Sequence, residues 1–333
     1  MARFFCVVLL KNDVLRAYKV SIKIILIKGG SFMLVIGTDH GNKQMKSTNC
    51  PPFISGLKES RTKPYGKDIL EYQGKYYILS KQRIPYKRDK TEDEKFFILT
   101  LFAIARELEF RNGFTKNILP IGLGVGLPPS FYGSLHKAFE KYFERGMVTF
   151  TYNGREQSIY LKDAKCYPQA YAAAITIFNE LVEYTKVLIV DIGGFTADYL
   201  LMREGEPDLS VCNSLENGII ILYNQISEKV NAEFDILLDE ADMDAILEGK
   251  ETVYSREIVD MVWAMAEDFV EDLFNSLREK KVDLKSGVVV FVGGGGIRLK
   301  KVIEASDKIG RSFFVEDINA NAKGYEMLYH MEM

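Results

Sequence analysis

The sequence has few of the residues that build metal centres and disulfide frameworks. It contains four cysteines and three histidines among 333 residues, all far apart, and no C-x-x-C pair. A zinc site, or a small domain held together by disulfides, requires close and paired spacings. We therefore expect free thiols and a cytoplasmic location, where the environment is reducing.

Long hydrophobic runs and an excess of one charge are missing as well. No apolar run approaches the roughly 18–20 residues that span a bilayer. The apolar stretch 4–10 precedes several charged residues and lacks a small-residue cleavage site, so neither a membrane segment nor a secretory signal is expected. The formal net charge of −3 is too small to indicate a protein that coats nucleic acid or a membrane surface.

What is present is the composition of an ordinary globular protein. Hydrophobic residues make up 47% of the chain and charged residues 27%, which excludes the disordered class. The length predicts two domains, each long enough to bury its own core. From Met33 onwards strand and helix signals alternate, which is typical of an α/β fold.

Residues 1–32 differ from the rest of the chain. They carry six basic residues and one acidic residue, and they end in Lys28-Gly29-Gly30, whose codons can form a bacterial ribosome-binding sequence just before Met33. We hypothesise that translation starts at Met33 and that residues 1–32 are an over-extended gene prediction. The alternative is an extra strand pair or an interaction arm, because 20–27 has β-propensity. A chain from Met33 would have 301 residues and a net charge of −8, which disfavours direct non-specific DNA binding.

Local signals predict where several elements begin and end. Thr91-Glu92-Asp93-Glu94 matches a capping box that opens a helix, and Asn153-Gly154 between two alternating runs predicts a hairpin. Pro168 is expected in the first turn of a helix that reaches about residue 183, and Ser255 is expected to cap a helix over 256–280. Buried strands are expected at 118–127, 187–190 and 288–292, and a loop-rich stretch at 51–90.

Three buried strands each lead into a glycine-bearing turn. The turns are Asp39-His40-Gly41-Asn42, Asp191-Ile192-Gly193-Gly194 and Gly293-Gly294-Gly295-Gly296. Glycine lets the backbone approach phosphate oxygens closely and aim its N–H groups at them. Asp39 and Asp191 are suited to hold a hydrated Mg²⁺ ion, which prefers hard oxygen ligands.

Two competing phosphate motifs can be excluded from the sequence. A Walker A loop occurs nowhere in the chain. The dinucleotide fingerprint G-x-G-x-x-G fails at the tetraglycine, because Arg298 and Leu299 stand where its last glycine would fall. A P-loop enzyme and a dehydrogenase are therefore not expected.

The order of the three turns resembles that of the actin-like ATPase superfamily, in which two related α/β domains bind ATP in the cleft between them. Residues 36–42 with Lys46 resemble the first phosphate loop, 190–198 the second, and 291–297 the adenosine loop; 168–174 and 322–328 resemble the two connecting helices. The strand 119–128, the Asp-Ile-Gly-Gly-x-Thr loop and the C-terminal Gly-Tyr-x-x-Leu-Tyr helix are most similar to ParM-type bacterial actins, which segregate plasmids.

The resemblance implies an actin-like fold with mixed five-stranded sheets flanked by helices. It implies domain I over 33–183 with a loop-rich subdomain at about 51–112, and domain II over 184–319 with a helical subdomain at about 226–280. A C-terminal helix in 320–333 would return to domain I.

The resemblance also implies the site residues. Asp39 and Asp191 would hold Mg²⁺ largely through water, and Gln169 would orient the attacking water; these three are the predicted catalytic residues. A glutamine cannot accept a proton as a base, which implies slow turnover. Lys46 is a phosphate contact or, alternatively, a surface charge. The predicted nucleotide-binding residues are Gly41, Asn42, Lys43, Lys46, Gly193, Gly194, Phe195, Thr196, Asn217, Gly218, Gly293, Gly294, Gly295, Gly296 and Ile297.

The implied function is an ATPase that polymerises into dynamic filaments for plasmid or DNA segregation, with ATP and Mg²⁺ as cofactors and GTP as an open alternative to ATP. The implied partners are further copies of the chain and a DNA-binding adaptor protein, without direct specific nucleic-acid binding or a membrane. Two alternatives stay open: a small-molecule kinase of the same superfamily, and a non-hydrolysing actin-like scaffold.

Overall fold

The computed structural model describes residues 33–333 except 86 and 88, and the hypotheses about residues 1–32 lie outside this part of the chain. The described residues form two compact units. Unit 1 consists of the described residues up to Val182 together with Asp317–Met333, and unit 2 is Glu183–Glu316.

Unit 1 is built on a sheet of nine strands among the described residues, in the order β3-β2-β1-β7-β9-β8-β5-β6-β4. Three central strands, β1, β7 and β9, run parallel to one another, and the other strand pairs among the described residues of this sheet are antiparallel. The strands are β1 (Leu34–His40), β2 (Gln44–Ser47), β3 (Phe53–Ile54), β4 (Leu57–Ser60), β5 (Ile69–Tyr72), β6 (Lys75–Leu79), β7 (Leu119–Leu127), β8 (Gly146–Tyr152) and β9 (Arg155–Pro168).

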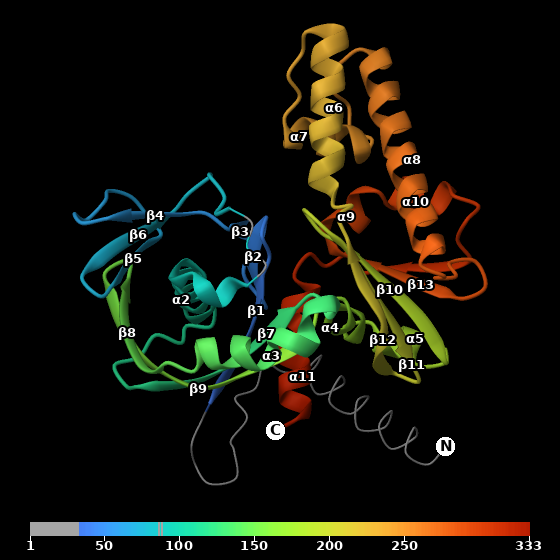
Figure 1. Ribbon diagram of the computed structural model, residues 1–333. Helices are drawn as coiled ribbons and strands as arrows, with labels where there is room; N and C mark the ends of the chain where they lie inside the picture. Colours follow the sequence, from blue (N-terminus) through green and yellow to red (C-terminus); the bar gives the residue numbers. More distant parts are fainter. Residues whose placement is uncertain (1–32, 86, 88) are drawn as a thin grey trace. The chain divides into compact units, whose positions relative to one another are not determined.

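The helices of unit 1 pack on this sheet. Figure 1 shows the sheet curling around α2, a mostly buried helix that faces β1, β2 and β8. The helices are the 3₁₀ turn η1 (Lys90–Glu92), α2 (Glu94–Phe110), α3 (Pro129–Phe143), α4 (Tyr171–Ile175), α5 (Phe178–Leu181) and α11 (Ala320–Met331).

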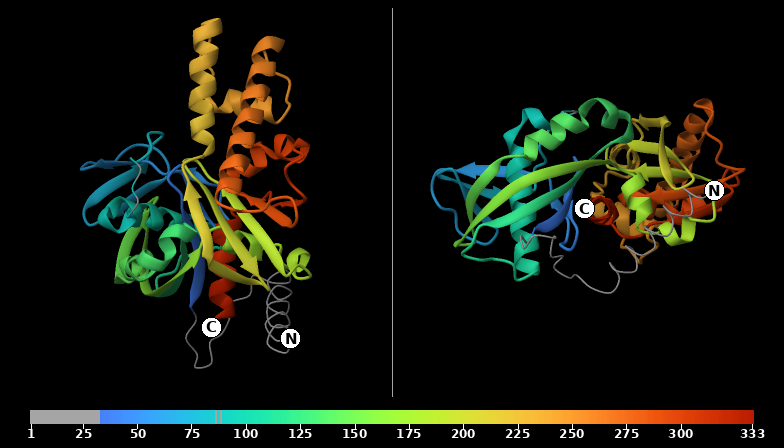
Figure 2. Two further views of the ribbon diagram at one scale, coloured as in Figure 1. Left: turned by 45° about the vertical axis from the view of Figure 1, so that its right-hand side comes forward. Right: turned by 90° about the horizontal axis from the view of Figure 1, so that it is seen from below.

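Unit 2 has a five-stranded sheet among the described residues, in the order β12-β11-β10-β13-β14. Its helices α6 and α8 lie side by side and extend away from the sheet (Figures 1 and 2). The elements are β10 (Lys186–Ile192), β11 (Ala197–Arg203), β12 (Glu206–Leu215), α6 (Ile219–Phe234), α7 (Glu240–Leu247), α8 (Arg256–Glu279), β13 (Val288–Val292), α9 (Gly293–Arg298), α10 (Lys300–Ala305) and β14 (Arg311–Phe314).

Several local predictions are confirmed. Asn153 and Gly154 both have positive φ and join β8 to β9, as a two-residue hairpin turn requires. Ser255 caps α8, with its side chain accepting from the Ile258 amide. The predicted strand 288–292 is β13.

Three local predictions are wrong. Thr91 does not form the capping box: Asp93 caps α2 by accepting from the Lys95 amide, and Asp89 caps η1. Pro168 ends β9 instead of starting a helix, and two short helices follow. The stretch 51–90 contains four short strands that extend the sheet of unit 1, which is therefore wider than the five strands expected.

A stripe of glycines lets α11 lie directly on the sheet. Gly122, Gly124 and Gly126 alternate along β7, and a Cβ at any of them would overlap Tyr325 or Tyr329 of α11. On the other side of α11, a Cβ at Gly324 would overlap the carbonyl of Ala172 in α4. The backbone of α11 is thus fixed between β7 and α4.

Replacing Gly324 by alanine should therefore destabilise the protein. The added methyl has to displace a backbone carbonyl, and overpacking of this kind costs about 1–3 kcal/mol. Gly133→Ala in α3 is the matched control, because open space surrounds that helical glycine. Alanine should raise the free energy of unfolding there by about 0.5–1 kcal/mol. Urea unfolding of both variants measures the free energy of unfolding. Equal changes in the two variants would contradict the close contact between Gly324 and the Ala172 carbonyl.

Candidate functional site

The first half of the candidate site lies at the end of β1 in unit 1. Asp39 is buried and stands directly opposite Lys46 in the β1–β2 pair. Its Oδ2 lies 3.4 Å from Lys46 Nζ, and its Oδ1 accepts a 3.1 Å hydrogen bond from Gln169 Nε2. Gln169, predicted from a distant part of the sequence, thus meets Asp39 and Lys46 at one carboxylate. Lys46 is largely buried, at 15% exposure of its side chain, and is not a free surface charge.

A strained turn positions Gln169. The next residue, Ala170, has φ 65° and ψ −58°, and the Tyr171 amide donates to the Gln169 carbonyl at 2.7 Å. This geometry is a γ-turn with positive φ, which is rare and strained for a residue with a Cβ. The Ala170 amide donates to Asn321 Oδ1 of α11 at 3.0 Å. Sequence reasoning missed Ala170 and Asn321, because no local motif indicates this turn.

The turn after β1 holds the predicted residues Gly41, Asn42 and Lys43. Ser55 fixes both ends of it: the Ser55 hydroxyl donates to the Gly41 carbonyl at 2.5 Å, and its amide donates to the Lys43 carbonyl. A Cβ at Gly41 would lie 2.6 Å from the Gln44 carbonyl oxygen. A side chain is therefore excluded at Gly41, as a close-approach turn requires.

His40 points away from this turn into the core. It is fully buried against the rings of Phe139 and Phe143. Its Nε2 lies 2.7 Å from Thr100 Oγ1, and Thr100 donates to the Phe96 carbonyl, so Nε2 carries the proton. Burial, together with the nearby charge of Lys90, lowers the pKa of His40 from 6.5 to about 3.

The second half of the site lies at the end of β10 in unit 2. Asp191 stands directly opposite Asp198 in the β10–β11 pair, and both are buried. Asp198 accepts hydrogen bonds from the hydroxyls of Ser214 and Thr196. Directly opposed residues share one face of a sheet, and like charges there repel.

The tetraglycine segment adjoins Asp191. Val292 is the parallel partner of Asp191, and a Cβ at Gly293 would overlap Asp191 Oδ1. A Cβ at Gly295 would overlap the Ile192 side chain, whereas Gly294 borders open space. Gly293–Gly296 form the first turn of α9, which the half-exposed Ile297 continues. The predicted second phosphate loop and the predicted adenosine loop thus lie side by side within unit 2.

The loop after β10 also caps α6. The carbonyls of Gly193 and Gly194 accept from the amides of Ile219 and Ile220, and that of Phe195 accepts from Gly218. A Cβ at Gly218 would overlap Phe195. These contacts bring Asn217 and Gly218 to the loop, but they also correct one expectation. The Gly193 amide donates to the Thr196 carbonyl at 2.8 Å and is not available to a phosphate in this conformation.

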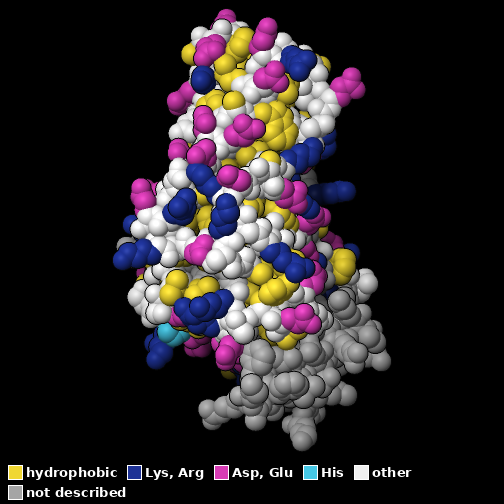
Figure 3. Space-filling model, turned by 90° about the vertical axis from the view of Figure 1, so that its right-hand side faces the viewer, with side chains coloured by type: hydrophobic (Ala, Val, Ile, Leu, Met, Phe, Trp, Pro, Cys, Tyr) yellow, Lys and Arg dark blue, Asp and Glu magenta, His cyan; other side chains and the backbone are white. Residues whose placement is uncertain are grey.

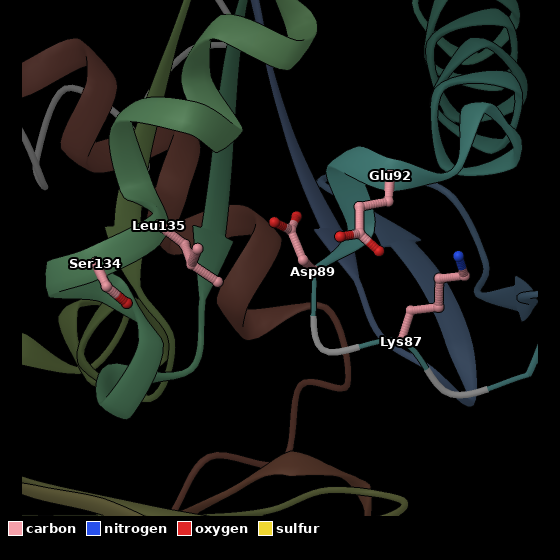
Figure 4. Close-up of a pocket in the computed structure, with 5 residues that line it drawn as sticks. All are labelled: Lys87, Asp89, Glu92, Ser134 and Leu135. Atoms are coloured by element: carbon pink, nitrogen blue, oxygen red, sulfur yellow. The ribbon is translucent and has the colours of Figure 1, made fainter.

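Two pockets within the units contain none of the predicted site residues. One, of about 440 Å³, lies between α3 and the η1 segment and is lined by Asp89, Glu92, Leu135 and two neighbours (Figure 4). The other lies in unit 2 and is described below. Within residues 33–333, less 86 and 88, no group of three or more His, Cys, Asp or Glu side chains is placed to hold a metal ion, and no helix is long and apolar enough to cross a bilayer.

Two family models match consecutive parts of the chain. The N-terminal domain of actin-like proteins matches residues 40–171, and the C-terminal domain of the archaeal MreB-like actin homologue matches residues 189–305. The chain belongs to the actin-like ATPase superfamily. A search of curated proteins gave no significant match.

Solved actin-like structures share this fold over 90% of the chain. Ta0583, an archaeal actin homolog, aligns over its whole length at 19% identity with a TM-score of 0.71, and has also been solved with ADP. Bacillus thuringiensis ParM with ATP aligns over 99% of its length at 14% identity and a TM-score of 0.64. The Alp12 filament structure aligns over 97% of its length at 17% identity and a TM-score of 0.60. The predicted actin-like fold is thereby confirmed.

Replacing Ala170 by glycine tests the strained turn. Glycine adopts positive φ without a steric penalty, so relief of strain of about 1 kcal/mol or more should offset the loss of one buried methyl. We expect the free energy of unfolding to stay constant or rise. The control is Ala173→Gly, because Ala173 lies within α4 and is equally buried. Its free energy of unfolding should fall by about 0.5–1 kcal/mol. Equal losses in the two variants, measured by urea unfolding, would rule out stored strain.

The buried His40 should make stability depend on pH. Its folded pKa of about 3 lies below the ordinary 6.5, so between these values the unfolded chain binds a proton that the folded chain does not. The free energy of unfolding should therefore fall as pH drops from 6.5 towards 3, by up to about 1.4 kcal/mol per pH unit. His40→Leu should flatten this dependence in denaturant titrations at several pH values. An unchanged slope would show that His40 is not the group responsible.

Proposed function

We propose that the two half-sites bind one Mg²⁺–ATP and that the chain hydrolyses it slowly while it polymerises into filaments. The observation that carries the proposal is the Asp39 carboxylate, buried and held between the Gln169 amide and the Lys46 ammonium. Burying an ionised carboxylate is costly. A nucleotide site explains better than packing why Asp39, Gln169 and Lys46 are buried together at the end of one strand.

Gln169 is suited to orient a water molecule. An ionised carboxylate only accepts hydrogen bonds, so the Gln169 NH₂ group must face Asp39, and its Oε1 remains to accept a hydrogen bond from water. Because an amide is not a base, Gln169 positions the water without taking its proton, and turnover is slow. Positioning and charge neutralisation are the main demands of phosphoryl transfer.

The two halves differ in charge in a way that supports a bound cation. In unit 1 the residue opposite the aspartate is Lys46, whereas in unit 2 it is a second acid, Asp198. Mg²⁺ bound through water would neutralise charge on the phosphates and ease the repulsion between Asp191 and Asp198. Lys46, freed from Asp39, reaches a phosphate, and the turns Gly41–Lys43 and Gly194–Thr196 supply backbone N–H groups.

Filament formation and DNA segregation extend the proposal beyond the single chain. The Alp12 structure is a filament, and B. thuringiensis ParM was solved with ATP; proteins with the same fold therefore support nucleotide binding and self-association here. We propose that ATP stabilises contacts between copies, that hydrolysis weakens them, and that a separate adaptor protein links the filament to plasmid or other DNA.

Light scattering and phosphate release, followed together after addition of Mg²⁺–ATP, test the proposal. The wild type should scatter light and then release phosphate, and Asp191→Ala should do neither. Phosphate transfer to a small molecule without light scattering would contradict the proposal and show that the protein is a kinase. If nucleotide changes neither light scattering nor phosphate release, the protein is a non-hydrolysing scaffold and the proposal is wrong.

Gln169→Ala should separate binding from hydrolysis. Without the amide that orients water, phosphate release should slow by about 10–100-fold, while the affinity for a fluorescent ATP analogue should change little. Gln169→Glu is the matched comparison because it keeps the size and adds a base. Lost nucleotide binding in Gln169→Ala would contradict the assigned role.

A further inference from the structure

One end of unit 2 carries a dense acidic surface. From Glu233 to Glu248 the sequence has seven acidic residues and no basic one. This acidic end comprises the last turn of α6, the loop that follows and α7; two exposed apolar residues, Leu237 and Val253, adjoin it. Figure 3 shows acidic side chains outnumbering basic ones over the upper part of the surface, with apolar patches between them.

A basic pocket lies elsewhere in the same unit. Its volume is about 540 Å³, and its lining has four cations and two acids around the buried Val282 and Leu284; the charged residues are Arg278, Lys281, Lys285, Lys308, Asp283 and Asp307. Asp283 is occupied in its own turn, where it accepts from the amides of Lys285 and Ser286. Among the described residues, Arg278, Lys281 and Lys285 make no ion pair.

Helix α8 keeps the two surfaces apart. Tyr254 lies just before α8 begins, and its pKa is raised by burial, by a hydrogen bond with Asp242 and by the charges of Asp242 and Asp239, so the acidic end lies near the start of α8. Arg278 is in the last turn of α8. A 24-residue helix is about 36 Å long. The acidic end and the basic pocket of one copy therefore cannot meet each other.

We propose that the acidic end of one copy docks into the basic pocket of a second copy. The pocket offers a cationic rim over an apolar floor, and the acidic end offers carboxylates beside the exposed Leu237. Opposite potentials steer such an encounter and fix its register. Because two different surfaces of the chain meet, the contact is heterologous and repeats without closing, as a filament requires. The inference rests on the proposed self-association and names the contact that produces it.

Charge reversal on each surface tests the contact. The acidic-end variant is Glu233→Lys with Glu251→Lys, the second of which lies three residues beyond Glu248, and the pocket variant is Arg278→Glu with Lys285→Glu. Among the described residues, these four side chains make no hydrogen bond or ion pair. Alone, each variant would place like charges opposite each other at the altered positions of every contact, and it should raise the critical concentration for ATP-dependent pelleting at least about tenfold. Mixed in equal amounts, the two variants should co-pellet, because the added lysines of one variant then face the added glutamates of the other.

Control experiments distinguish failure of the docking contact from failure of the proposed function. Lys137→Glu, an exposed reversal on α3, should pellet like the wild type, and circular dichroism should show that all variants are folded. If the wild type pellets and either folded reversal variant also pellets normally, the inference is wrong. If both variants fail and their mixture does not recover, the pocket does not receive the acidic end, and another acidic partner is its occupant. If the wild type itself never pellets with ATP, the proposed function fails instead.

Discussion

The burial of a carboxylate at the end of a central strand is the constraint on which both units depend. An ionised carboxylate taken out of water costs several kcal/mol unless partners compensate for it. Asp39 has two such partners, and one of them, Gln169, comes from the segment that follows β9. Keeping Gln169 there requires the strained turn at Ala170, which is in turn held by Asn321 of α11. A single charge thus explains contacts among three remote parts of unit 1.

The two units repeat one arrangement around that constraint. In each, a strand ending in aspartate turns back into an antiparallel partner, β2 or β11, and has a parallel strand, β7 or β13, on its other side. What differs is the residue opposite the aspartate, a lysine in unit 1 and an aspartate in unit 2.

The sequence predicted the features that local chemistry determines. The Asn153-Gly154 turn, the Ser255 cap and the β-branched strand β13 each follow from a few neighbouring residues. The resemblance carried by the three glycine turns and the two connecting helices predicted the fold and selected Asp39, Gln169 and Lys46, which meet in the structure. Prediction from local motifs failed where several capping residues are close together: Asp93 caps the helix that Thr91 was expected to cap, and Asp89 caps η1 just before it.

Long-range contacts were not predictable from the sequence. Pro168 continues β9 because that strand still pairs with Leu127 of β7 after its partner β8 has ended, so its missing N–H faces an unpaired edge. The same holds for the loop after β10, whose carbonyls cap α6 and whose Gly193 amide donates to the Thr196 carbonyl. Such contacts depend on segments that the fold brings together, and no spacing in the sequence records them.

The central claim is that both buried carboxylates serve one nucleotide. Isothermal titration of the protein with a non-hydrolysable ATP analogue and Mg²⁺ tests it most directly, on the wild type, Asp39→Ala and Asp191→Ala. The account predicts one nucleotide per chain and an affinity that falls at least about tenfold when either aspartate is removed. Two independent binding events, or an affinity that depends on only one of the aspartates, would contradict it.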